Sequence, residues 1–482
     1  MSQQNWESEP KGNVVEDIQA EKPNGSPRNT SNDSFVEGKP VEQTLQRQLK
    51  ARHIAMISIG GVIGTGLFLG TATSLANGGP IGLLLGYITV GTVCYSVMIS
   101  LGEIVAFLPI PGGHIKLAER FVDPAFSFAM GWNYWYNWTI IFTIQRPAEL
   151  SAAAVLINFW EPSAKVNNAV WITICLLVAL GINLMGAGAY GEAEFIFASI
   201  KVITIVGLII LGIVLDLGGG PNHDRIGFRY WKNPGPFVQW HGISGSEGQF
   251  LGWWAVMTQA AFSFIGTEIT AIAAGEAKNP RKNLPKVINA ALLTSAWSAA
   301  SSDLYTSSRA LFGLAVSGNA PAIFKKTNRN GLPYPAILFC ALFALLAFMG
   351  INSGSGKVFG WFSAMTSVAG LMTWFGISVT YIRFYYGFKL QGYDRSTLPY
   401  ASALQPYAAY YAAIASWVIC LFSGWEVFLK GGWNTATFVT NYMAFALFPV
   451  LYIIWKLKTG VPIVRTKDMD FVTGLDAIEA DT

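Results

Sequence analysis

Long apolar runs separated by short polar segments fill the chain from residue 54 to residue 455. Each run is close to the length that a helix needs to cross a bilayer, about 20 residues. The runs are continuous rather than alternating, and they exceed the ~10 residues of a strand in a membrane barrel. They span residues 54–77, 81–108, 126–160, 169–189, 195–215, 251–274, 287–314, 336–351, 358–382, 407–425 and 437–455. The pattern predicts an all-α polytopic membrane protein with about eleven spans.

The segments outside these runs predict how the chain is divided. Residues 1–46 are rich in Glu, Asn, Ser, Lys, Pro and Gly with few large apolar side chains, which predicts a disordered tail. Arg47, Lys50 and Arg52 beside the first run favour a cytosolic location for it. We expect a tail at 1–46, a transmembrane domain at 47–457 with an external loop at 216–249 and a cytosolic loop at 275–286, and a cytosolic tail at 458–482.

Composition narrows the function further. Hydrophobic residues make up 52% of the chain and charged residues 12%, against roughly 25% charged in soluble proteins, which excludes an ordinary soluble enzyme. The net charge of +4 is spread over short loops, so nucleic-acid binding has no support. The four cysteines lie inside apolar runs without metal-ligand spacing, and the four histidines lie at run ends or in loops. We expect no catalytic residue, metal or cofactor.

The basic loops indicate an irregular topology. The 275–286 loop and the 324–330 loop both carry basic clusters, so both favour the cytosol, yet one run separates them. Our hypothesis is that about one span with its external loop is missing between Lys286 and Val287. The alternative is a genuine eleven-span protein with an external C-terminus. In the third run, Arg146 either pairs with an anionic substrate or belongs to a short insertion, FTIQR.

Two spans are interrupted by glycine. Residues 60–68 read GGVIGTGLF, and backbone freed from helical bonding there predicts an anion cradle at Gly64, Thr65 and Gly66. Close helix packing through small residues is the alternative. Residues 262–268 read FSFIGTE, in which Glu268 is an intramembrane acid. Two such spans, five apart, are what an inverted repeat of five helices places face to face, which favours a transporter.

Three further polar or aromatic positions have two interpretations each. Lys201, inside the fifth run, is either a titrating group or a lysine that extends to the interface. Glu103, near the inner end of the second run, is either a gate or a structural charge. Phe262 is either a lid over the substrate or a core residue.

At these residues the chain resembles the fungal amino-acid permeases, the yeast amino acid transporter family of the amino acid, polyamine and organocation superfamily. The similar stretches include RHIAMISIGGVIGTGLFLG, LGEIVAFLPIPGG, GWNYWYNW, PAELSAAAVLINFW and FSFIGTEITAIAAGEAKNPRKNLPK. The resemblance implies a five-plus-five inverted-repeat transporter fold with broken spans 1 and 6, two terminal helices, and import of amino acids by proton symport. It also implies twelve spans, so the seventh is lacking here.

The resemblance also implies roles for the candidate residues. The substrate carboxylate meets the backbone at Gly64 to Gly66, its ammonium meets carbonyls near Phe262 to Ile265, Glu268 senses protonation, and Lys201 takes the place of a sodium ion. The complete candidate set comprises the substrate-binding residues Gly64, Thr65, Gly66, Phe262, Ser263, Phe264, Ile265 and Gly266, the proton-coupling residues Lys201 and Glu268, and the gating residues Glu103 and Trp374.

The expected partners are an amino acid, a proton and the lipid bilayer. The resemblance favours the plasma membrane, and Lys11, Lys22 and Lys39 in the N-terminal tail are candidate sites for a ubiquitin ligase. A chain that lacks a span is expected to transport poorly. A non-transporting amino-acid sensor on the same scaffold is the alternative function.

Overall fold

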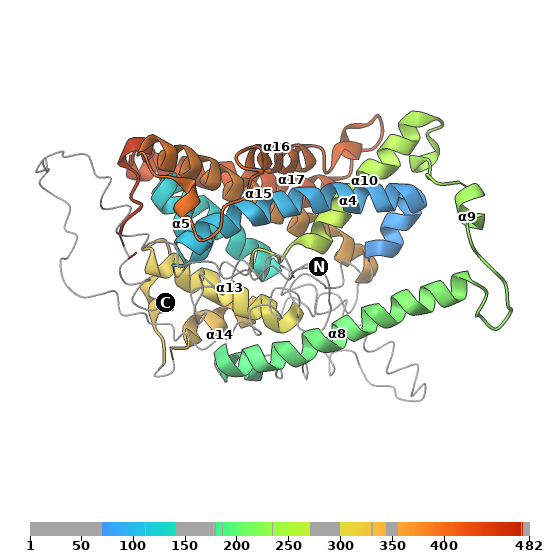
Figure 1. The fold of residues 1–482 in the computed structure, drawn as a ribbon, viewed down its shortest axis with the longest axis horizontal. Helices are drawn as coiled ribbons and strands as arrows, with labels where there is room; N and C mark the ends of the chain where they lie inside the picture. The colour runs from blue at the N-terminus through green and yellow to red at the C-terminus, as the bar shows by residue number, and fades with distance from the viewer. Residues whose placement is uncertain are drawn as a thin grey trace, which may run out of the picture.

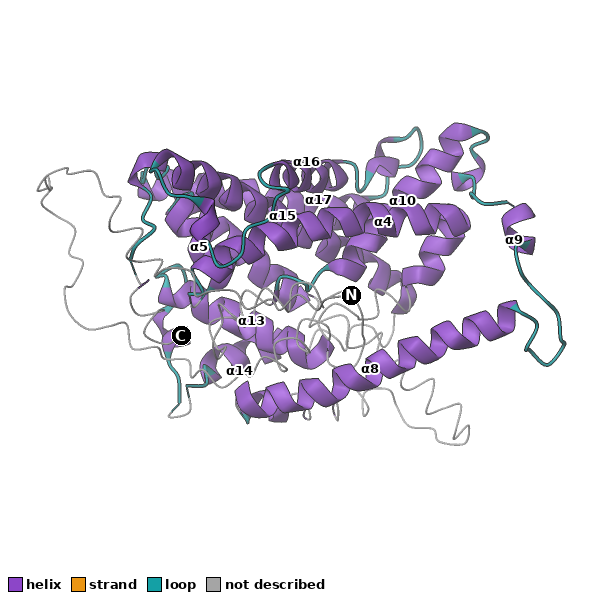
Figure 2. Cartoon of the chain, in the orientation of Figure 1, coloured by secondary structure: helices purple, strands orange, loops and turns teal. Residues whose placement is uncertain are grey.

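The structure is a computed structural model in which every regular element is a helix, over the part of the chain that it describes (Figure 1, Figure 2). That part comprises residues 70–110, 112–140, 173, 177, 180–185, 187–233, 235–269, 299–328, 331–343, 355–473 and 475. The α-helices are α4 (Gly70–Phe107), α5 (Gly113–Phe121), α8 (Ala187–Asp216), α9 (Arg229–Lys232), α10 (Ser246–Phe264), α13 (Ala299–Val316), α14 (Tyr334–Phe343), α15 (Ser355–Leu390), α16 (Tyr407–Leu421) and α17 (Thr435–Thr459). An unlabelled helical stretch covers residues 124–140.

Short 3₁₀ turns connect several of these helices. They are η1 (Trp240–Gly242), η3 (Ala322–Lys325), η5 (Arg395–Thr397), η6 (Trp425–Phe428) and η7 (Thr466–Asp468). Four of the described helical segments are long and apolar enough to cross a membrane: Gly70–Phe107, Tyr190–Asp216, Gly360–Leu390 and Thr435–Thr459. These helices fit the integral membrane protein that the apolar runs predict.

Helix α4 contains a sharp kink that separates the first predicted run from the second. Gly79 has φ +73 and Pro80 follows it, so the regular helical bonding is interrupted there. The chain before α10 packs against this kink, since Ile81 N donates to Pro236 O (3.0 Å) and Val238 N donates to Gly78 O (3.4 Å). Backbone hydrogen bonds therefore attach the segment between α8 and α10 to the kink of α4.

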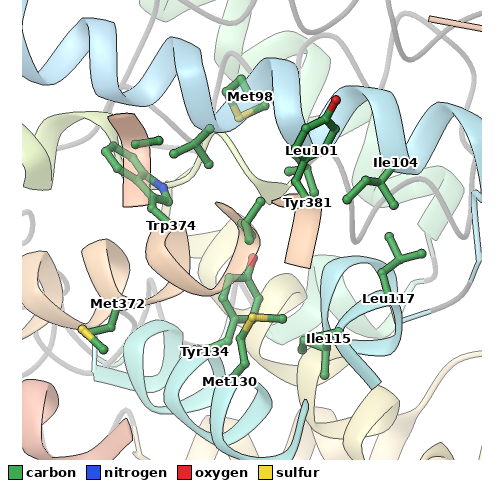
Figure 3. Close-up of a cluster of buried hydrophobic side chains, with 14 of the residues drawn as sticks. Met98, Leu101, Ile104, Ile115, Leu117, Met130, Tyr134, Met372, Trp374 and Tyr381 are labelled. Atoms are coloured by element: carbon green, nitrogen blue, oxygen red, sulfur yellow. The ribbon is translucent and has the colours of Figure 1, made fainter. Parts of the chain in front are cut away.

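Helix α15 lies at the centre of the packing. It contacts α4, α10, α16 and α17, and it is much more buried than the other three long apolar segments. Its apolar side chains share one core with those of α4, α5 and the 124–140 helix (Figure 3). The helix continues to Leu390, beyond the predicted run that ends at 382. It continues because Arg383 there donates to the carbonyls of Phe121 and Val464, so its charge is accommodated.

The C-terminal segment after α17 folds back onto the same core. Phe471 is 1% exposed and lies against the rings of Phe121, Phe384 and Phe388. Arg120 on α5 donates to the carbonyl oxygens of residues 470 and 473. Residues 464–475 are thus part of the packed structure, which the sequence pattern did not predict.

Candidate functional site

A turn interrupts the helical chain directly after α10. The helix ends at Phe264, and residues 265–268 form a turn before Ile269, whose N donates to Gly266 O (3.1 Å). Gly266 has φ +114, a conformation that side chains with a Cβ rarely adopt. All of residues 265–269 are buried. The glycine-containing FSFIGTE motif therefore holds the end of α10 and a turn that is buried in the core.

The Glu268 carboxylate lies at this turn with its two oxygens in different surroundings. Oε2 accepts hydrogen bonds from Gly266 N (3.1 Å) and from Trp374 Nε1 on α15 (3.3 Å). Oε1 is buried and has no hydrogen-bond partner, and the side chain is 0% exposed. A buried carboxylate oxygen without a partner carries a large desolvation cost when it is charged. The site thus leaves one oxygen of the Glu268 carboxylate buried and unsatisfied.

The walls around the turn come from α4, α15 and the 124–140 helix. From α4, Cys94 Sγ lies 3.5 Å from Thr267 Oγ1, and Tyr87 OH lies 2.9 Å from Ser263 Oγ. The 124–140 helix is fixed to α15 because Asn133 Nδ2 donates to the carbonyl of Ala369 (2.9 Å). Elements far apart in sequence are thereby held around one carboxylate.

The aromatic residues near the turn differ in burial. Phe264 is partly buried, with its ring centroid 6.1 Å from that of Tyr87, and Phe262 is also partly buried, on the last turn of α10. Trp374 is fully buried, and Figure 3 shows it in the same core as Tyr134. Trp374 thus donates a hydrogen bond to the Glu268 carboxylate in this conformation.

Glu103 lies away from the turn, nine residues beyond Cys94 on α4, about 14 Å along the helix axis. Its buried carboxylate accepts hydrogen bonds from Arg395 Nε and Nη2 (both 2.9 Å), from Tyr381 OH (2.7 Å) and from Ser402 N (3.1 Å). The two candidate gating residues therefore occupy different places. Trp374 contacts the turn, and Glu103 joins α4 to α15 and to the connection between α15 and α16.

A second buried carboxylate fixes the same end of the molecule. Asp123 is 0% exposed, accepts from Lys456 Nζ (2.7 Å) and Tyr452 OH (3.2 Å), and caps the 124–140 helix through Phe126 N (2.7 Å). Basic side chains on the chain after α15 and at the end of α17, Arg395 and Lys456, thus pair with buried carboxylates near α5. This grouping agrees with a common side for these segments.

Several candidates are not placed relative to the turn. Gly64, Thr65, Gly66 and Arg146 lie outside the described residues. Lys201 belongs to α8, which packs against α13, and its side chain is outside the described part. Of the sequence-derived set, the structure brings together Gly266, Glu268 and Trp374, with Ser263, Phe264 and Ile265 beside them.

Sequence reasoning missed Tyr134, Tyr381 and Arg395. Arg395 lies between two apolar runs, where the sequence pattern does not reveal that it pairs with a buried carboxylate. Tyr134 lies in the aromatic motif GWNYWYNW, where the spacing does not distinguish a core tyrosine from one beside Glu268. The position of this motif against α15 becomes visible only in three dimensions, where Asn133 donates to Thr373 Oγ1 (3.1 Å).

Comparisons with known proteins agree on one class of protein. The family model described as Amino acid permease matches residues 53–292 and 285–467. A dicarboxylic amino acid permease of Saccharomyces cerevisiae is 37% identical, over 92% of this chain and 82% of the relative. A proline-specific permease of Emericella nidulans is 36% identical over 92% and 91%, and a lysine-specific permease of Saccharomyces cerevisiae is 35% identical over 89% and 80%.

The alignments contain positions that this chain lacks. The first of them extends over 504 positions, whereas 92% of 482 residues is about 443 residues. About 60 aligned positions of that relative therefore have no counterpart in this chain. The two stretches matched by the family model overlap at residues 285–292. This overlap lies beside the 275–286 loop, which shares its basic character with the 324–330 loop although one apolar run separates them.

Proposed function

We propose that this chain, which belongs to the amino acid permease family, imports amino acids across a membrane by proton symport. The relatives are permeases rather than enzymes, and the apolar helices fit an integral membrane protein. The plasma membrane is the proposed location. A ubiquitin ligase acting on Lys11, Lys22 or Lys39 is the proposed regulatory partner.

The observation that carries proton coupling is the buried Glu268 carboxylate with one oxygen bound and one without a partner. In this mechanism Glu268 accepts a proton at the interrupted helix, and loss of its charge removes the desolvation cost of the buried site. The backbone of residues 262–266 then accepts hydrogen bonds from the substrate ammonium, and the backbone of Gly64, Thr65 and Gly66 donates to its carboxylate. Lys201 is the proposed second proton-coupling group.

In this proposal, the gating movement is a rearrangement of α15. Trp374 on this helix holds the Glu268 carboxylate, while Tyr381, two turns further along, donates to Glu103. A rearrangement of α15 therefore alters both contacts together. Helix α15 would then link the protonation of Glu268 to the ion pair at the α5 end of the bundle.

The chain itself is proposed to lack the seventh span of its family. The roughly 60 unmatched alignment positions are enough for one span of about 20 residues with a long external loop, which supports this proposal. The meeting of the two family matches at 285–292 supports a position next to Lys286. A consequence is weak transport or none, and this deficit favours the non-transporting sensor as the alternative.

Uptake measurements test the proposal. Radiolabelled amino acids are offered to a permease-deficient yeast that expresses either this chain or a form in which the corresponding segment of the dicarboxylic relative is inserted between Lys286 and Val287. We expect uptake by the restored form that collapses with a protonophore and with Glu268→Gln, and little uptake by the present chain. Uptake by the present chain at the level of the restored form would refute the deletion, and uptake insensitive to the protonophore would refute symport.

A further inference from the structure

Among the described residues with a buried polar atom that has no hydrogen-bond partner, three titratable side chains are considered together because they lie along one path through the core. They are Glu268, Tyr134 and His114, which are 0%, 0% and 1% exposed. The atoms without partners are Glu268 Oε1, the Tyr134 hydroxyl, and both ring nitrogens of His114. Because nearly all buried polar atoms in folded proteins have partners, three such residues in sequence require an explanation.

Tyr134 lies between the other two. The residue before it, Asn133, donates to Thr373 Oγ1 on α15 (3.1 Å). Trp374, the next residue of α15, donates to Oε2 of Glu268. Figure 3 shows the hydroxyl of Tyr134 directed into the space between α15 and α4 rather than toward its own helix. On its other side the ring meets His114 edge-on, with ring centroids 4.6 Å apart and an interplanar angle of 81°.

His114 brings this series to the end of the molecule that carries the basic loops. It lies on the buried side of α5, whose other side presents the partly exposed ion pair of Lys116 and Glu119 (2.8 Å). Burial lowers the pKa of His114 to about 3, so its ring is neutral, with one nitrogen that donates and one that accepts. Only the width of α5 thus separates the His114 ring from the partly exposed side of that helix.

The charged and titratable groups nearby have other partners. Glu103 is paired with Arg395 and accepts from Tyr381, and Cys94 contacts Thr267. Arg120 on α5 pairs with the C-terminal segment. Tyr134 and His114 are titratable side chains that can each both donate and accept a proton, and their polar atoms have no partner.

We propose that Tyr134 and His114, with water between them, form the route by which a proton moves between Glu268 and the solution at the α5 end. The proposal rests on the proton symport proposed above. When Tyr134 gives its hydroxyl proton to the Glu268 carboxylate through water, it takes one from the side of His114. His114 gives up the proton on one nitrogen and binds one on the other, so both residues return to their starting state.

Hydrogen exchange at Glu268 tests this route without requiring transport. The full chain is purified, reconstituted in lipid nanodiscs and transferred to D₂O, and the Glu268 carboxyl band is followed by infrared spectroscopy. The band is identified by its loss in Glu268→Gln, after scanning pH until it appears. The variants are Tyr134→Phe and His114→Phe. Each keeps a ring and removes only polar atoms that have no partner, so folding stability is not expected to fall.

The matched control is Tyr136→Phe, two residues along the same helix. Its hydroxyl is also buried without a partner, but it lies on another face. We expect exchange at Glu268 to slow at least about tenfold in Tyr134→Phe and in His114→Phe, with Tyr136→Phe as fast as the parent, since positioned proton-transfer groups contribute about 10²-fold or more. Unchanged exchange in Tyr134→Phe and His114→Phe would overturn the route.

A transport measurement separates this proposal from the one on which it rests. In the span-restored form, Tyr134→Phe is expected to slow proton-driven uptake and to leave amino-acid exchange at equal pH intact, since exchange needs no net proton movement. Absence of proton coupling in the restored parent would refute symport alone. Slow Glu268 exchange in the two variants would then still support the route.

Discussion

Arg395 binds the buried carboxylate of Glu103 through two hydrogen bonds, from Nε and from Nη2, each 2.9 Å long. The carboxylate is 0% exposed and the Arg395 side chain 24%. This pair connects the inner part of α4 to the chain that follows α15, where Tyr381 and Ser402 also bind the carboxylate.

Removing Arg395 is expected to destabilise the chain strongly. Arg395→Ala leaves Glu103 charged and buried without its counter-ion, a change that costs about 3–5 kcal/mol in buried pairs. Arg395→Lys keeps the charge but loses the bidentate hydrogen bonding, so the loss of folding stability is smaller. Thermal unfolding in detergent, followed by size-exclusion fluorescence, measures both. Equal melting temperatures for Arg395→Ala and the parent would show that the pair is not structural.

The kink in α4 is expected to require glycine at position 79. A Cβ there would lie 2.9 Å from both Pro236 O and Val238 N, and φ is +73. Gly79→Ala should therefore cost at least about 1–2 kcal/mol from the left-handed conformation, with steric strain in addition. Gly82→Ala is the matched control, because its Cβ would meet its nearest atom at 3.7 Å. Melting temperatures of the two variants in detergent should differ, with Gly79→Ala lower.

Truncating Phe471 should release the C-terminal segment. Its ring stacks on Phe121 with centroids 5.4 Å apart and also contacts Tyr393, so Phe471→Ala should cost about 3–5 kcal/mol in local packing. Limited proteolysis of the purified chain is expected to cleave this variant near its C-terminus much faster. Ile463→Ala, at a 48% exposed position, is the control and should resist cleavage as the parent does. Equal cleavage of both would contradict the packing.

The attachment of this segment should weaken in acid. Burial alone would raise the pKa of Asp470, but hydrogen bonds from Thr473 and Val472 and the charge of Arg120 outweigh it and hold the pKa below its usual range. A lowered folded-state pKa gives stability that is present above the unfolded value, about 4, and is lost as pH falls through the folded value.

Proteolysis at a series of pH values with an acid-tolerant protease measures this effect. The parent should lose protection of residues 464–475 below about pH 4, and Asp470→Asn should be less protected than the parent at neutral pH with little further loss in acid. A parallel pH dependence in the parent and in Asp470→Asn would show that another group is responsible.

The indole of Trp374 is expected to matter for transport more than for folding. Trp374→Phe keeps an aromatic ring in the core and removes the donor to Glu268 Oε2 at 3.3 Å. Loss of a hydrogen bond to a charged group is worth about 1.5–3 kcal/mol, so proton-driven uptake by the span-restored form should fall about tenfold or more. Trp433→Phe, at a 61% exposed position, is the control. Full uptake by Trp374→Phe would exclude a role for this bond.

Much of the fold followed from hydrophobic patterning, and the particular contacts did not. The length of the apolar runs identified the long helices α4, α15 and α17, because burial in a bilayer demands about 20 apolar residues whatever their neighbours. The same rule ended the α15 run near residue 382, since it treats Arg383 as a boundary. The arginine instead finds carbonyl acceptors from two other segments, which no local pattern records.

The residues of the candidate site were likewise predicted only in part from the sequence. The glycine and the acid of FSFIGTE drew attention to the segment where α10 ends in a buried turn, because an intramembrane acid is costly and glycine weakens a helix. Tyr134 and His114 were not singled out, because an aromatic motif and a histidine at the end of a run have the same pattern whether their polar atoms are paired or not. Glu103 had two open interpretations, and its pairing with Arg395 is a three-dimensional fact.

The aromatic cluster around Phe471 also bears on the order in which the chain matures. Phe121, Phe384 and Phe388 are all synthesised before Phe471, which follows the last long helix. The faces of these rings that Phe471 covers stay uncovered until the final residues are synthesised and fold back. Chaperones and quality-control factors that bind exposed aromatic surface can therefore distinguish a nascent or prematurely terminated chain from a finished one.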